Sequence, residues 1–356
     1  FALVYALSSP ITATLTAGLE RRRVLLLSIG GFLLANLLAA TATSYAMLMA
    51  ARVLLAVSAG LYSPAASAFG GNAVGPEHRG RALAIVVGGV SASVALGAPL
   101  GTLVGSMLGW RFTFLAVAGI CVVALAGILW RLPTQPAGPR VTLGERLRTA
   151  GQRDVGLELL TTLFWGMGGF TIYTFTAPLL ESIANWRGVL LSAVLLAFGV
   201  GAVAGTALGG VVLDRFRPVR WQAFVLAALA MLSCGLSIAA STLPLSSAAG
   251  VVVMGIYAGW GVMGWSFHPA QQLRLMSMAP RSAPVVLSLN QSAMYLGIAL
   301  GATAGGFTLR WASPAALGWV AATWQLSALL VLGLSMRLAA QASAPQPVPE
   351  VTRSAA

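Results

Sequence analysis

Few ionisable side chains fall inside the long apolar stretches of this sequence, and they limit the chemistry it can do. Arg52 lies within such a stretch, where a charge is costly and suggests function. We expect it to contact a substrate or relay protons, with snorkelling to the outer interface as the alternative. Glu158 and Glu181 are expected at the inner and outer interfaces. His268 is expected to be a hydrogen-bonded interfacial residue near the inner end of its stretch, with a pH-responsive role as the alternative.

The same inventory argues against an enzyme. Intramembrane serine proteolysis needs a Ser and His pair within the bilayer, and aspartyl proteolysis needs two membrane Asp; neither set is present in suitable positions. The 2 His are poorly placed to ligate haem, and Cys121 and Cys234 match no metal or disulfide spacing. There is no Lys for a proton pump and no nucleotide-binding motif. We therefore expect neither catalytic residues nor a metal.

Composition places these residues in a membrane protein. The 356 residues are 58% hydrophobic and 8% charged, with a mean hydropathy of +0.87, and such a chain cannot cover a soluble surface with charge. Apolar runs of about twenty residues each are long enough to cross the hydrocarbon core. They predict an all-α polytopic membrane protein with eleven spans, at residues 1–19, 24–44, 47–70, 82–107, 112–130, 156–180, 188–213, 220–241, 247–270, 283–309 and 314–338.

The distribution of Arg predicts the orientation. The net charge of +13 comes from 21 basic residues, all of them Arg. Seventeen lie in one alternating set of loops and tail, three in the other, and Arg52 lies inside a span. Under the positive-inside rule the C-terminus is cytoplasmic and Phe1 lies toward the outside. Topology thus explains the charge without nucleic acid as a partner, and an odd span count with an outside start predicts that a first span is missing.

Internal similarity divides the chain into two halves in the same orientation. Gly97, Gly101 and Gly105 in the fourth span correspond to Gly297, Gly301 and Gly305 in the tenth, which is typical of parallel repeats in secondary transporters. Glycines four residues apart let helices approach closely, either as static packing or as a sliding surface between the halves. We predict an N-terminal bundle at 1–131, a cytoplasmic linker at 132–155, a six-helix bundle at 156–338 and a disordered cytoplasmic tail at 339–356.

Three motifs resemble the major facilitator superfamily, and within it the twelve-span drug:proton antiporter and sugar-efflux type. GGVVLDRFR, at 209–217, is similar to the family's Gly-x-x-x-Asp-Arg loop between helices 8 and 9. GAPLG, at 97–101, is similar to the antiporter motif of helix 5, and ARVLLAVSAG places Arg52 at the helix 4 arginine. The resemblance implies gating or motif roles for Gly89, Gly97, Pro99, Gly101, Gly210, Asp214 and Arg215.

The resemblance also implies which residues line a central substrate cavity. Aromatic walls with a few polar groups suit a neutral or amphipathic organic molecule. Asn290 and Gln291 should face the protein interior in any case, because bare amides in lipid would lack hydrogen bonds. The candidates are Arg52, Trp165, Phe170, Tyr173, Tyr257, Trp260, Asn290, Gln291 and Tyr295.

The expected function is secondary active transport by alternating access. The resemblance of GAPLG to the family's helix 5 antiporter motif favours export of a drug, sugar or related metabolite by proton antiport. Import by a proton symporter or uniporter is the alternative. The proton gradient is the expected energy source, with no bound cofactor. The expected partners are the small-molecule substrate, protons and the lipid bilayer, and the protein is expected to be a monomer in a bacterial inner membrane, because the Arg-rich, Lys-free composition suggests a GC-rich bacterial genome.

Overall fold

The computed structural model describes residues 1–72, 89–90, 92–137, 142–213, 215–243, 246–279 and 283–342. Within these ranges all regular structure is helical. The first group of helices comprises α1 (Ala2–Leu15), α2 (Arg21–Ala40), α3 (Tyr45–Asn72), the π-helical turn η2 (Ser93–Gly97), α5 (Ala98–Leu108) and α6 (Trp110–Arg131). After α7 (Leu143–Ala150), the second group comprises α8 (Arg153–Tyr173), α9 (Thr176–Ala184), α10 (Val189–Leu213), α11 (Pro218–Thr242), α12 (Ser247–Met278), α13 (Ala283–Trp311), the short 3₁₀ turn η4 (Pro314–Ala316) and α14 (Leu317–Ala342).

The described helices follow the predicted spans closely. Nine are long and apolar enough to cross a membrane, and Ala2–Leu15 and Ala95–Leu108 are shorter apolar helices. The predicted span at 156–180 is interrupted between α8 and α9, and part of the predicted span at 82–107 lies outside the described residues. The predicted span at 247–270 is too short, because α12 continues to Met278 and brings Arg274, which we had expected in a loop, into the helix.

Local sequence accounts for several helix boundaries. Gly109 adopts φ +92 between α5 and α6, a conformation that favours glycine. Asn185 ends α9 in the left-handed region with φ 54. Pro218 begins α11, where its missing N–H costs nothing, and the Ser246 hydroxyl accepts from the Ala249 N–H at 3.2 Å to cap α12. These breaks set the ends of the apolar helices.

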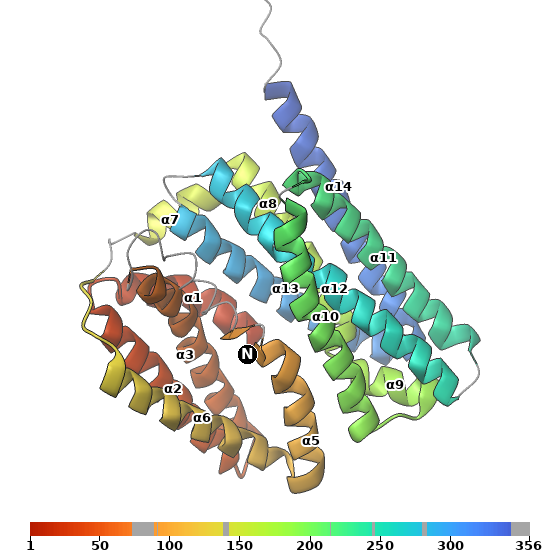
Figure 1. The fold of residues 1–356 in the computed structure, drawn as a ribbon, viewed down its shortest axis with the longest axis horizontal. Helices are drawn as coiled ribbons and strands as arrows, with labels where there is room; N and C mark the ends of the chain where they lie inside the picture. The colour runs from red at the N-terminus through yellow and green to blue at the C-terminus, as the bar shows by residue number, and fades with distance from the viewer. Residues whose placement is uncertain are drawn as a thin grey trace, which may run out of the picture.

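The two groups of helices lie side by side, the first coloured red to orange and the second yellow-green to blue in Figure 1. In the first, α3 and α6 pack on α2, and α5 packs on α6. In the second, α8 packs on α13 and α14, α10 packs on α12, and α11 packs on α12 and α14. The groups meet where α1 contacts α13 and where η2 and α5 contact α10. The bundle limits at 1–131 and 156–338 remain predictions.

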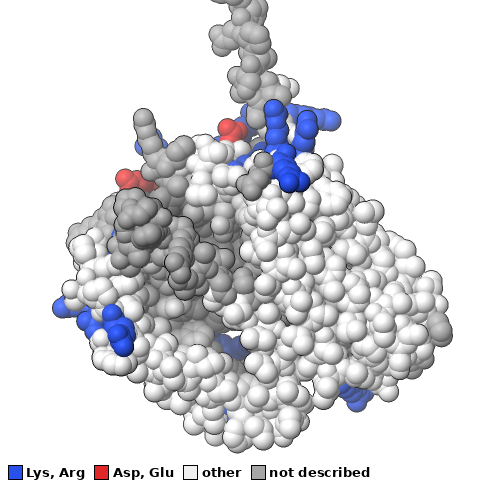
Figure 2. All heavy atoms as spheres, in the orientation of Figure 1, with Lys and Arg blue, Asp and Glu red and all other residues white. Residues whose placement is uncertain are grey.

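The outer surface of the described chain is apolar. Large side chains such as Trp130 (79% exposed) and Leu330 (75% exposed) point outward. Figure 2 shows broad uncharged walls, with Arg gathered mainly at the end of the molecule where α14 leaves the bundle, and a hollow between the two groups. A soluble protein could not expose this much apolar surface, whereas lipid tails would cover it.

The glycine rows pack helices together within the second group. A Cβ on Gly209 would lie 2.8 Å from the Ser266 carbonyl of α12, and one on Gly301 would lie 2.8 Å from Met167 Cα of α8. Gly205 likewise adjoins Val262 of α12. By contrast, no atom of the described residues lies within 4 Å of a Cβ position at Gly97 or Gly101. Static packing therefore explains the rows in α10 and α13, and the α5 row is not a tight seam between the groups.

The linker contains a short amphipathic helix, α7. Its start is a capping box: the Glu145 N–H donates to the Thr142 hydroxyl at 3.2 Å, and the Thr142 N–H donates to the Glu145 carboxylate at 2.8 Å. The Thr142 N–H and hydroxyl stabilise the ionised carboxyl and lower the pKa of Glu145. Arg146 donates to the Ser288 hydroxyl at 2.7 Å, which ties α7 to α13, and burial lowers the pKa of Arg146.

Candidate functional site

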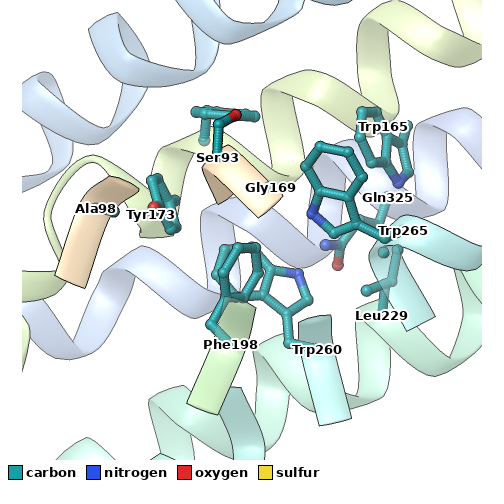
Figure 3. Close-up of a pocket in the computed structure, with 12 residues that line it drawn as sticks. Ser93, Ala98, Trp165, Gly169, Tyr173, Phe198, Leu229, Trp260, Trp265 and Gln325 are labelled. Atoms are coloured by element: carbon teal, nitrogen blue, oxygen red, sulfur yellow. The ribbon is translucent and has the colours of Figure 1, made fainter. Parts of the chain in front are cut away.

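An aromatic cavity of about 240 Å³ lies mainly in the second group of helices, at its contact with the first. Helices α8, α10, α11, α12 and α14 supply most of its wall, and η2 and the start of α5 close one side (Figure 3). The cavity is therefore shared between the two groups. The lining residues are Ser93, Ala98, Trp165, Gly169, Phe170, Tyr173, Phe198, Leu229, Trp260, Gly264, Trp265 and Gln325.

The aromatic side chains form a continuous wall. The ring centroids of Tyr173 and Phe198 are 5.0 Å apart, and those of Phe198 and Trp260 are 5.2 Å apart. Phe170 meets Tyr173 edge-on at 5.6 Å. Packed rings of this kind present both faces and edges, so they suit flat, uncharged molecules.

Four predicted residues line the cavity: Trp165, Phe170, Tyr173 and Trp260. Tyr257 does not; it is fully buried behind Trp260, and its hydroxyl donates to the Thr176 hydroxyl at 3.0 Å. The resemblance to the family's helix 10 implied that both rings line the cavity, but only the tertiary packing decides which one reaches it.

The structure places the other predicted substrate residues elsewhere. Tyr295 of α13 stacks on Tyr5 of α1 at 3.6 Å, in the contact between the two groups. Asn290 is buried as predicted, and its side-chain oxygen accepts from the Thr162 hydroxyl at 2.6 Å. Gln291 is half-buried on α13, and Arg52 is exposed on α3. None of these four is among the described lining residues of the cavity.

None of the motif residues is among the described residues that line the cavity, although Gly97 and Pro99 flank Ala98, which does line it. Pro99 is buried in the first turn of α5, and no described atom lies within 4 Å of a Cβ position at Gly89, Gly97, Gly101 or Gly210. Asp214 lies outside the described residues, and Arg215, exposed, follows the end of α10. Their gating roles remain predictions.

Eight of the described lining residues were not predicted from the sequence, among them Phe198, Trp265 and Gln325. Gln325 is fully buried on α14, and its side-chain oxygen accepts from the Ser233 hydroxyl at 2.9 Å. An amide in the apolar segment ATWQLSALL is the same signal that singled out Asn290, and it could have indicated Gln325. Nothing comparable distinguishes Phe198 from the other phenylalanines.

Glu158 corrects a prediction, because it is buried rather than interfacial. Its side chain is 0% exposed and pairs with Arg274 of α12 at 2.8 Å. The Ser335 hydroxyl donates to the same carboxylate oxygen at 2.9 Å and accepts from Arg274 at 2.8 Å. The cause is the continuation of α12 past residue 270, which supplies a buried cation that the sequence assigned to a loop.

The ion pair belongs to a larger buried polar cluster. Gln271 donates to the Glu158 carbonyl and to the Thr162 hydroxyl, both at 2.9 Å, and accepts from Gln222 of α11. We use the name polar cluster for this group. It comprises Glu158, Thr162, Gln222, Gln271, Arg274, Asn290 and Ser335, from α8, α11, α12, α13 and α14.

His268 is also not the hydrogen-bonded interfacial residue that the sequence predicted. Its ring packs edge-on against Trp165 at 4.7 Å and tilted against Trp265 at 5.1 Å. Its Nε2 is buried and has no hydrogen-bond partner among the described residues. Glu181 does lie at the surface as predicted, where it pairs with Arg187.

Comparison with known proteins agrees with this architecture. Residues 1–302 match the sequence model of the Major Facilitator Superfamily. The chain belongs to the Major Facilitator Superfamily. It is 34% identical to the uncharacterized MFS-type transporter YbcL of Bacillus subtilis, over 93% of this chain and 83% of that protein. The predicted resemblance is thus confirmed.

Further relatives and a solved structure extend this family assignment. A chloramphenicol resistance protein of Streptomyces lividans is 33% identical over 62% of this chain and 57% of its own length. A probable sugar efflux transporter of Mannheimia succiniciproducens is 27% identical over 90% of this chain and 79% of its own. The human organic anion transporter MFSD10 (TETRAN) shares the fold, with a TM-score of 0.67 at 19% identity over 93% of this chain and 82% of its own.

The family assignment establishes the general activity. This superfamily member is a multi-pass membrane transporter, with the bilayer around it and a small molecule as its substrate. The predicted all-helical fold is confirmed by the described helices and by the solved structure.

Proposed function

We propose that this superfamily member exports a neutral or amphipathic organic molecule by proton antiport, with the aromatic cavity as its substrate site. The observation that carries the proposal is the composition of the cavity. Of the described residues that line it, none is charged and six are Trp, Phe or Tyr, and four of these rings form one connected wall, Phe170, Tyr173, Phe198 and Trp260. Such a lining favours a lipophilic ring-containing substrate over a sugar, which needs many hydrogen bonds.

The position of the cavity supports alternating access. Ser93 and Ala98 reach it from the first group of helices, and the remaining lining residues come from the second. A rigid-body rocking of one group against the other would therefore change the cavity's exposure. Gly199 of α10 marks this contact, because a Cβ there would lie 2.5 Å from Ala95 Cα.

Export is the direction that the relatives favour. The Streptomyces and Mannheimia proteins are named for drug resistance and sugar efflux. We further propose that the proton gradient is the energy source and that the protein is a monomer in a bacterial inner membrane. The Arg distribution supports a cytoplasmic C-terminus.

The test measures proton movement in energised everted vesicles containing the protein, with a pH-sensitive dye and a panel of lipophilic drugs, nucleosides and sugars. Dye recovery on addition of a lipophilic aromatic compound, absent in vesicles without the protein, is the expected result. Recovery with sugars alone would overturn the assignment of substrate class. If folded, inserted protein gives no recovery with any compound, and cells instead accumulate a labelled compound, the direction is import by symport or uniport.

A further inference from the structure

The aromatic cavity contains one amide whose hydrogen-bonding capacity is only half used. Gln325 is 0% exposed to solvent and lines the cavity from α14. Its oxygen accepts the Ser233 hydroxyl at 2.9 Å, while its Nε2 is buried and has no partner among the described residues. A primary amide has two N–H donors, and buried donors are nearly always bonded. The free N–H therefore indicates that a ligand accepts a hydrogen bond from it.

The surroundings hold this amide in place. Ser233 of α11 is 2% exposed and fixes the oxygen end, so the nitrogen end is left for the cavity. On the other side Gly168 of α8 provides the room, because a Cβ there would lie 2.7 Å from Gln325 Cγ and 3.0 Å from the Ala321 carbonyl. Figure 3 shows the Gln325 amide among the indoles of Trp165, Trp260 and Trp265.

We infer that the Gln325 amide donates a hydrogen bond to the substrate and selects uncharged, flat aromatic molecules that carry a hydrogen-bond acceptor, such as a carbonyl or nitro oxygen. This inference rests on the proposed function, since it assumes that the cavity is the substrate site. It names the substrate class more narrowly than aromatic walls alone do. A ligand without an acceptor would leave the buried N–H unpaired, so it binds less tightly.

The experiment compares two probes of the same shape, 9-fluorenone and fluorene, which differ by a carbonyl in place of a methylene. Binding of each tritiated probe is measured by equilibrium dialysis with the purified protein in lipid nanodiscs, and empty nanodiscs correct for partition into lipid. The wild-type protein is expected to prefer fluorenone by about tenfold, the factor of one net hydrogen bond in a buried site.

Substitutions at Gln325 assign that preference to the amide. Gln325→Leu should abolish it by lowering fluorenone affinity while fluorene affinity stays the same or rises. Gln325→Met keeps the length of the side chain but has no N–H donor, so it should also lose the preference. If either variant fails to fold, Ser233→Ala still tests the inference, because releasing the oxygen should reduce the preference to roughly threefold.

A matched control and three contrary outcomes complete the test. Gln152→Leu makes the same substitution at an exposed position before α8 and should keep the wild-type ratio. A preference that survives in Gln325→Leu, or equal binding of both probes by the wild type, would overturn the inference; so would binding of neither probe. Because dialysis needs no gradient, failed export with an intact preference would count against the proposed function and not against the role of Gln325.

Discussion

The second group of helices encloses two interiors of opposite character, built largely by the same helices. Toward the first group, α8 and α12 contribute Trp165, Trp260 and Trp265 to the aromatic cavity. Further along, the same two helices contribute Glu158, Gln271 and Arg274 to the polar cluster. One interior is hollow and almost without hydrogen bonds, and the other is filled with them.

The difference indicates that the polar cluster holds the helices together and that the cavity binds the ligand. In the polar cluster, hydrogen bonds and one ion pair join five helices, although Glu158 Oε2, Gln222 Oε1 and Arg274 Nε have no partner among the described residues. In the cavity, the Gln325 Nε2 is left unpaired among the described residues. Bonds across five helices stabilise the arrangement of those helices, whereas an unpaired donor in an aromatic hollow favours a ligand that carries an acceptor.

The largest expected effect is on stability, from breaking the polar cluster. Glu158→Gln removes the partner of buried Arg274 and should destabilise the protein by about 3 kcal/mol, since an unpaired buried charge is costly. SDS-induced unfolding of the purified protein measures this. The double variant Glu158→Gln, Arg274→Met should recover much of the loss. Wild-type stability of the single variant would contradict a bracing role for the pair.

The next effect should be on binding alone. Trp260→Ala removes an indole that contacts Tyr173 and Phe198 in the cavity wall, so 9-fluorenone affinity should fall roughly 30-fold, about 2 kcal/mol. Dialysis in nanodiscs measures it, with Trp311→Ala on the exposed end of α13 as the control. If Trp260→Ala lowered the resistance to SDS as much as Glu158→Gln does, the separate roles of the two regions in binding and stability would be contradicted.

Helix packing beside the cavity gives a smaller effect. Gly205→Ala puts a methyl group against the Val262 backbone, so α10 and α12 must separate, at about 1–2 kcal/mol in stability. Gly101→Ala on α5 has open space and should be tolerated. SDS unfolding of the pair measures the difference. Equal losses would show that the α5 glycines are packed after all.

The smallest effect is expected at α7, outside both regions. The lowered pKa of Glu145 means that its capping bond stabilises α7 fully above the ordinary value of 4.5 and is lost as the pH falls through the lowered pKa. Thr142→Ala removes the hydroxyl that accepts from the Glu145 N–H and donates to the Glu145 carboxylate. It should therefore speed hydrogen exchange of α7 more at pH 7 than at a pH below the lowered pKa, after correction for intrinsic rates. The polar cluster and the cavity should be unaffected, and a pH-independent difference would argue against the capping bond.

Much of the fold was predictable because each span carries its own signal. Length and hydropathy marked the apolar segments, whose ends in the structure include Gly109 and Pro218. The repeated glycines also predicted close helix contacts, which the structure shows at Gly205 and Gly301 but not at Gly101. Local propensity and bilayer thickness are enough for these predictions, since they do not require knowledge of neighbouring helices.

The site was predictable only in part. Trp165, Phe170, Tyr173 and Trp260 line the cavity as expected, whereas Tyr295 packs between the two groups of helices. Glu158 was expected at the interface because it lies at the inner end of its apolar segment. Its partner, Arg274, lies on a helix distant in the sequence. A side chain's environment depends on which helices surround it, and a single apolar segment does not specify this.

The sequence by itself determined that this chain is a helical membrane protein with duplicated halves and motifs of the Major Facilitator Superfamily. Those properties follow from composition, segment length and short local patterns. Only the tertiary structure decided that Glu158 meets Arg274, that His268 lies between Trp165 and Trp265, and that Gln325 lines the cavity with an Nε2 that has no partner among the described residues. The physical reason is that burial and hydrogen bonding are properties of contacts between helices distant in the chain.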